Sequence, residues 1–149
     1  MNEKAIFPFL SVAQNENDFL EQLSFKEKVN FNSYTKIYET DVNYTVKQID
    51  SLIKKGALQL SQQLVSQGFS QKFYWLYFKI PSTEHPKKQL LIELNNPFID
   101  QVKLYEKTDT SFTKIGFGGD RNRAFDDRNY KNRRFIFPLN KSPKARAYY

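Results

Sequence analysis

The chain has 149 residues, of which 40% are hydrophobic and 16% aromatic, and it carries a formal net charge of +7. A chain of this length fits one domain and buries enough apolar surface to fold without a metal or a disulfide. It contains no cysteine, which excludes disulfides, thiolate catalysis and sulfur-ligated zinc. No apolar run approaches the roughly 18 residues that span a bilayer. We therefore expect a soluble domain with a core rich in aromatic rings, any membrane part lying outside it.

Residues 1–33 allow two interpretations. Lys4 precedes a short apolar stretch over residues 5–10, and residues 11–13 have the small side chains of a signal-peptide cleavage site. Pro8 interrupts the apolar stretch. We expect this region to be either the remnant of a signal region or an N-terminal arm.

Two strands and one helix are predicted in the first half of the chain. Residues 34–38 alternate β-formers and indicate a strand. Helical spacing of apolar residues runs from Val46 to Ile53, and Gly56 is placed to end that helix. Residues 73–80 are apolar on both faces and predict a strand covered from both sides.

The second half of the chain is predicted to consist of strands joined by turns and loops. The strands are expected over residues 89–94, 99–105, 112–117, 135–139 and 147–149. Parallel strands would need a helical crossover between each pair, and the sequence offers none. The predicted fold class is therefore all-β, an antiparallel β-sandwich or barrel with one or two short helices.

A series of short motifs follows one order along the chain. They are Tyr38-Glu39-Thr40-Asp41, Trp75-Leu76-Tyr77-Phe78, the segment Asn96-Pro97-Phe98-Ile99-Asp100-Gln101-Val102-Lys103-Leu104-Tyr105, Gly119-Asp120, Arg128, and Phe135-Ile136-Phe137-Pro138-Leu139. In this order they resemble the type-2 extracellular domain of bacterial 7TMR-DISM receptors, the seven-transmembrane receptors with diverse intracellular signalling modules.

This resemblance implies both a fold and a location. It implies that residues 34–149 form a jelly-roll sandwich similar to carbohydrate-binding modules, with the last strand truncated at Tyr149. It places the domain on the periplasmic or extracellular face, tethered to the cytoplasmic membrane through seven transmembrane helices that precede a signalling output. The arginine-rich segment 121–134 departs from the family's pattern.

Residues suited to catalysis are few. His85 is the only histidine and lies in a turn-forming segment, where a solvated loop side chain is the simplest interpretation. Asp126, Asp127 and Glu93 have no matched acid or base partner in the sequence. We predict no catalytic residue, no metal, no cofactor and no enzymatic activity.

Trp75 has two possible roles. Strand alternation places it on one face with Phe73 and Tyr77, where the three rings would suit stacking on a sugar. The opposite face, with Leu76 and Phe78, is apolar as well. We therefore favour the core between two sheets for Trp75 and keep ligand stacking as the second interpretation.

The excess positive charge is concentrated in residues 121–149, and the long connection over residues 120–134 is dense in hydrogen-bonding side chains. Arginine binds carboxylate or phosphate oxygens with two parallel hydrogen bonds, and long loops at sandwich ends commonly carry binding sites. The competing interpretation is that Arg128 pairs with a neighbouring aspartate and pins the loop. The candidate ligand-binding residues are Arg128, Asp120, Asn132, Arg133 and, secondarily, Trp75.

The sequence favours a non-catalytic extracytoplasmic sensor domain of a bacterial transmembrane receptor. Its expected partners are a carbohydrate or small-molecule ligand, such as a saccharide or small organic anion, and the receptor's attached transmembrane and cytoplasmic signalling modules. The alternative is a nucleic-acid-binding β-barrel, because basic residues in 121–134 alternate with Phe125 and Tyr130, a mixture that suits phosphates and stacked bases. The ordered motifs account for more of the chain, so no nucleic acid is expected.

Overall fold

The computed structural model describes residues 35–61, 71–80, 90–94, 99–119, 135–140 and 142–149. These residues form the elements β1 (Thr35–Thr40), α2 (Val46–Lys54), β2 (Phe73–Ile80), β3 (Leu91–Leu94), β4 (Val102–Lys107), β5 (Phe112–Gly118), β6 (Phe135–Pro138) and β7 (Arg146–Tyr148). Every strand predicted from residue 34 onward is present within a few residues of its expected bounds, and so is the predicted helix.

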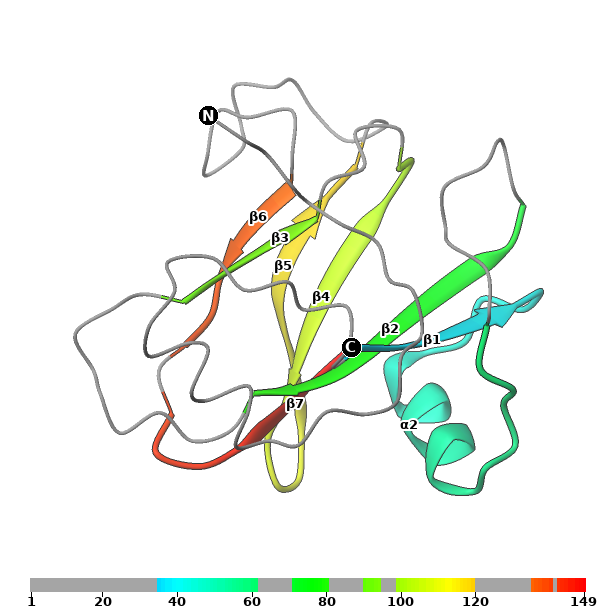
Figure 1. The fold of residues 1–149 in the computed structure, drawn as a ribbon, viewed down its shortest axis with the longest axis horizontal. Helices are drawn as coiled ribbons and strands as arrows, with labels where there is room; N and C mark the ends of the chain where they lie inside the picture. Colours follow the sequence, from blue (N-terminus) through cyan, green and yellow to red (C-terminus); the bar gives the residue numbers. More distant parts are fainter. Residues whose placement is uncertain (1–34, 62–70, 81–89, 95–98, 120–134, 141) are drawn as a thin grey trace.

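The strands form two antiparallel sheets, shown in Figure 1. The larger sheet has the order β1-β2-β7-β4-β5, and the smaller one pairs β3 with β6. β7 lies between β2 and β4, and just beyond it Tyr149 and Tyr105 exchange two backbone hydrogen bonds of 2.8 and 3.0 Å. The predicted all-β, antiparallel sandwich class is confirmed.

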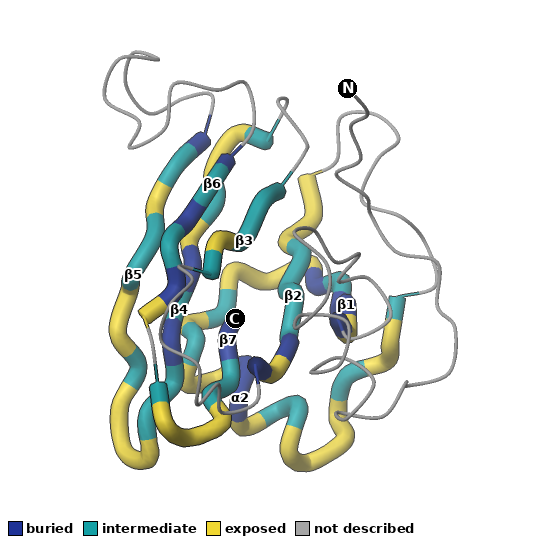
Figure 2. Tube along the Cα trace, turned by 60° about the vertical axis from the view of Figure 1, so that its left-hand side comes forward, coloured by how far each residue is buried: buried dark blue, intermediate teal, exposed yellow. Residues whose placement is uncertain are grey.

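The main core lies between the two sheets and is rich in aromatic rings, as the composition predicted. The Phe78 ring stacks on the Tyr148 ring with their centroids 5.3 Å apart. In Figure 2 buried positions alternate with half-buried ones along β6 and recur on β4. The buried cluster consists of Phe78, Ile80, Leu104, Phe135, Phe137, Leu139 and Tyr148.

Two glycines of β5 make room for the rings of β6. A Cβ atom at Gly116 would lie 2.6 Å from the Phe137 ring, and one at Gly118 would lie 2.8 Å from the Phe135 ring. The two glycines are two residues apart and therefore lie on the same face of the strand. The close approach of the sheets at this point depends on the absence of a side chain at both glycines.

Two predictions about β2 were wrong, namely that the strand is covered on both faces and that Trp75 lies in the core between the two sheets. Only Phe78 and Ile80 are buried, whereas Phe73 is 37% exposed and Trp75 is half-buried outside the main core. Phe78 and Ile80 face the smaller sheet, so alternation turns Trp75 to the opposite face. The smaller sheet has two strands of four residues, which is too little to cover all eight residues of β2.

α2 lies beside the other face of the larger sheet. Thr45 caps its N-terminus in a capping box, in which the Gln48 side chain accepts from the Thr45 backbone N–H at 2.8 Å. The helix stops before Gly56, whose φ of 64° lies in the left-handed region that glycine tolerates. Ile49 is fully buried, so it anchors the helix.

Candidate functional site: a lysine-lined groove

A groove of about 420 Å³ opens between α2, β2, the turn after β4, and β7. Its volume falls in the range of about 300 to 1,000 Å³ that is usual for small-molecule sites. The polar and charged residues that line it include Asp50, Lys54, Tyr77, Lys79, Lys107 and Tyr149, with Asp109 also present.

Asp50 is the central acidic group of the groove, and its side chain is only 11% exposed. The Nζ atom of Lys107 donates to Oδ1 at 2.6 Å, and the Nζ atom of Lys54 lies 2.9 Å from Oδ2. The hydroxyl of Tyr149 donates to Oδ1 as well. The carboxylate is therefore held by three donors, two of which are cations.

These contacts determine how the groove titrates. Burial by itself would raise the pKa of Asp50, but hydrogen bonds from Lys107, Tyr149 and Lys54 outweigh it and lower the pKa to about 2. Burial is also the main cause that raises the pKa of Tyr149, followed by its hydrogen bond to Asp50. At neutral pH the carboxylate is charged and the phenol is protonated.

Lys79, Ala147 and Lys107 form a row across three adjacent strands. Ala147 of β7 pairs with Lys79 of β2 on one side and with Lys107 of β4 on the other. Directly paired residues point to the same face of a sheet, and adjacent strands lie about 4.8 Å apart. The backbones of the two lysines are therefore about 10 Å apart, with the small alanine side chain between them.

The two lysines of this row differ in their partners. Lys107 binds Asp50, and its Nζ atom lies 5.4 Å from the centre of the Phe112 ring. Lys79 is exposed and forms no ion pair with any residue that the structure describes. Among the described residues, the charged ones that line the groove are three lysines, Arg146 and two aspartates, so positive charge is in excess there.

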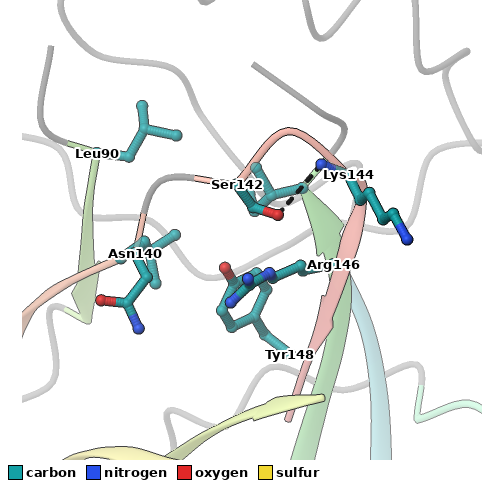
Figure 3. Close-up of a pocket in the computed structure, with 8 residues that line it drawn as sticks. Leu90, Asn140, Ser142, Lys144, Arg146 and Tyr148 are labelled. Atoms are coloured by element: carbon teal, nitrogen blue, oxygen red, sulfur yellow. Dashed lines mark hydrogen bonds between the residues drawn. The ribbon is translucent and has the colours of Figure 1, made fainter. Parts of the chain in front are cut away.

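A second buried carboxylate, Glu106, lies on the opposite face of the larger sheet. It is 3% exposed and accepts from the Tyr148 hydroxyl at 3.0 Å, from Arg146 at 2.7 Å and from Asn140 at 3.3 Å. Arg146 and Asn140 lie at a small cavity beside Tyr148 (Figure 3). Its volume of about 10 Å³ holds no more than one water molecule, so this cavity is too small for a ligand.

Four of the predicted ligand-binding residues, Arg128, Asp120, Asn132 and Arg133, lie outside the described residues. His85, Asp126 and Asp127 also lie outside them. The structure does describe the glycine that precedes this segment. Gly119 has a φ of 142°, and a Cβ atom there would lie 2.2 Å from the carbonyl oxygen of Asp100. It follows β5, whose other end adjoins the turn that borders the groove.

Trp75 is the fifth predicted site residue, and the structure places it on β2 opposite Tyr38. Alternation puts it on the same face of the sheet as Tyr77 and Lys79, which line the groove. It is half-buried and does not line the groove itself. Stacking of a ligand on Trp75 stays a prediction.

Sequence reasoning did not find the groove. Asp50 follows the buried Ile49 and precedes Lys54 by one helical turn, and an acidic residue beside an apolar helix face signals a buried ion pair. Its other partners lie 57 and 99 residues further along the chain. No local pattern joins residues at such separations.

The comparison with protein families identifies the chain. The family model for 7TMR-DISM extracellular 2 matches residues 32–149. The chain therefore belongs to this family of receptor extracellular domains, as its motifs predicted, and the family places it on the extracellular or periplasmic side. No curated protein and no solved structure matches it. Among the described residues, no helix has the length and apolar character needed to cross a membrane.

Proposed function

We propose that this domain is the non-catalytic, ligand-binding sensor of a bacterial transmembrane receptor and that its ligand binds in the lysine-lined groove. The observation that carries the proposal is the groove itself, a concave space of about 420 Å³ in a domain of a receptor family. Its polar lining residues, among them Lys79, Lys107 and Tyr149, are of the kind that fix the orientation of a ligand in a small-molecule site.

The groove chemistry suits a saccharide or a small organic anion. Lysine ammonium groups donate to hydroxyl and carboxylate oxygens alike. Tyr77 contributes a ring to the wall, and the Tyr77 and Tyr149 ring centroids are 5.1 Å apart. A ring of this kind packs against the apolar face of a ligand.

Binding without catalysis is supported by the state of the two buried carboxylates. A general acid or base works best with a pKa near the operating pH. Burial by itself would raise the pKa of Asp50, but the hydrogen bonds from its three donors lower it to about 2. Glu106 accepts three hydrogen bonds from side chains of the fold. Both groups are suited to holding structure and charge in place.

The output of the sensor would pass through the membrane part of the receptor. Membership of the 7TMR-DISM family supports an attachment to seven transmembrane helices and a cytoplasmic signalling module. Signalling then requires that the ligand bind one receptor state more tightly than the other. β7, which contributes Ala147 to the groove wall, is a route by which binding would affect the sheet.

A ligand screen tests the proposal. Saccharides and small organic anions are added separately to the folded domain, and a binder is expected to raise the melting temperature. Proton NMR of the mixture should show the bound compound chemically unchanged after prolonged incubation. A domain that binds none of these compounds, or that converts one of them, contradicts the proposed function.

The position of the site is tested by filling the groove. Ala147→Trp places a large ring between Lys79 and Lys107 and should abolish binding of any ligand in the groove, whatever its charge. Lys103→Trp, at an exposed position on β4, is the matched control and should bind normally. If Arg128→Gln abolishes binding and Ala147→Trp does not, the ligand binds at the segment that the sequence predicted.

A further inference from the structure

We propose that the groove selects a small carboxylate or phosphate anion, held between Lys79 and Lys107 over Ala147, and that Asp50 is an internal anion that competes with this ligand. The inference rests on the proposed ligand-binding function and names the ligand class and the regulation of that site. Its basis is the row of paired residues across β2, β7 and β4.

The row has the geometry of a two-point clamp. Its two lysines are separated by one strand, on which the residue paired with both of them, Ala147, has only a methyl side chain. About 10 Å separates their backbones, and each lysine stem is long and flexible enough to lean inward. An anion of a few atoms placed over Ala147 is within reach of both lysines.

The charge of the row is only partly neutralised from within the protein. Lys107 binds Asp50, and Asp50 also binds Lys54 and the Tyr149 hydroxyl. Lys79 has no carboxylate partner among the described residues and lies on the other side of Ala147. An anion that binds Lys79 is then positioned to attract Lys107 away from Asp50, which retains two of its three donors.

This arrangement explains why the ligand should be charged. A neutral saccharide would bring no negative charge to Lys79 or Lys107 and would gain nothing from the excess positive charge. An anion gains Coulomb attraction from Lys79 and shares that of Lys107, and it is repelled by Asp50. Asp50 therefore lowers the affinity and makes the site selective for anions that exceed it in charge or in fit.

Variants of opposite expected effect provide the test, with succinate and inorganic phosphate as the probes. Binding to the folded domain is followed by amide chemical shifts in NMR at low salt. Lys79→Gln and Lys107→Gln should each weaken binding by about two- to fivefold, the range for a partly exposed ion pair. Asp50→Asn should strengthen binding by a similar factor, because Asn still accepts hydrogen bonds but does not repel the ligand.

The matched control is Lys103→Gln, which removes an exposed lysine of β4 outside the groove and should leave affinity unchanged. Raising the salt concentration should weaken binding in the wild type. Lys79 is exposed, so its variant should fold even where Lys107→Gln and Asp50→Asn are less stable.

Three results would overturn the inference. The first is equal loss of affinity in Lys79→Gln and Lys103→Gln, which indicates general attraction to a basic surface. The second is weaker anion binding in a folded Asp50→Asn domain. If a neutral saccharide from the screen binds, is blocked by Ala147→Trp and binds Lys79→Gln as tightly as the wild type, the sensor function stands and the anion inference fails.

Discussion

Asp50 connects the helix, the sheet and the groove through one carboxylate. Its three donors come from α2, β4 and the residue after β7. Removing a partner from a buried charge costs more than the pair gains, because the remaining charge is left without compensation. The same group that would compete with a ligand therefore also holds α2 against the sheet.

The lowered pKa of Asp50 predicts how stability depends on pH. Its pKa falls from 3.8 to about 2 on folding, despite the burial that by itself would raise it. The charged form is favoured in the folded state, so its contribution is present above pH 4 and is lost as the pH falls toward 2. That contribution amounts to about 2 kcal/mol.

Urea denaturation of the wild type and of Asp50→Asn between pH 2 and pH 7 checks this prediction. The variant should be less stable at pH 7 by up to about 2 kcal/mol. The difference should shrink below pH 4 as the wild-type carboxylate is protonated. A difference that stays constant down to pH 2 would show that ionisation of Asp50 does not stabilise the fold.

Trp75 is predicted to contribute less to stability than its size suggests. Truncating a fully buried large aromatic side chain costs about 3 to 5 kcal/mol. Trp75 is half-buried on the face away from the main core, so Trp75→Ala should cost about 2 kcal/mol. Tyr148→Ala, at a residue with 1% exposure, is the comparison and should cost distinctly more. Equal losses measured by chemical denaturation would place Trp75 in the core after all.

At the scale of elements, the contact between β5 and β6 depends on two glycines. Gly116→Val should destabilise the domain by about 1 to 3 kcal/mol, the cost of overpacking a core, because its side chain would overlap the Phe137 ring. The double variant Gly116→Val with Phe137→Ala should recover part of that loss, since the ring is then absent. Denaturation of the two variants measures both effects. No loss in the single variant would mean that the sheets separate easily at this point.

The elements could be predicted from the sequence because their signals are local. Alternation marked β3, β4 and β5, and helical spacing followed by Gly56 marked α2. The faces of β2 could not be assigned, because the strand is apolar throughout and the size of the opposing sheet is not a local property. The groove was missed for a related reason, since it joins α2 to β7 across most of the chain.

At the scale of the whole molecule, the larger sheet has two differently used faces. One face buries Phe78, Leu104 and Tyr148 against the smaller sheet, and the Tyr148 hydroxyl donates to Glu106 on that face. The other carries α2 and the groove with its excess of lysines. The main buried cluster therefore lies on the first face, and the groove lies on the second.

The central claim is that the ligand binds in the groove between α2 and β7. Hydrogen–deuterium exchange of the domain, with and without a compound from the ligand screen, measures this directly. Bound ligand should slow exchange in α2, residues 46–54, and around β7, residues 146–149, more than elsewhere. Protection concentrated instead at residues 116–119, which precede the segment that carries Arg128 in the sequence, and at Asp100 and Gln101, which lie against Gly119, would contradict the claim.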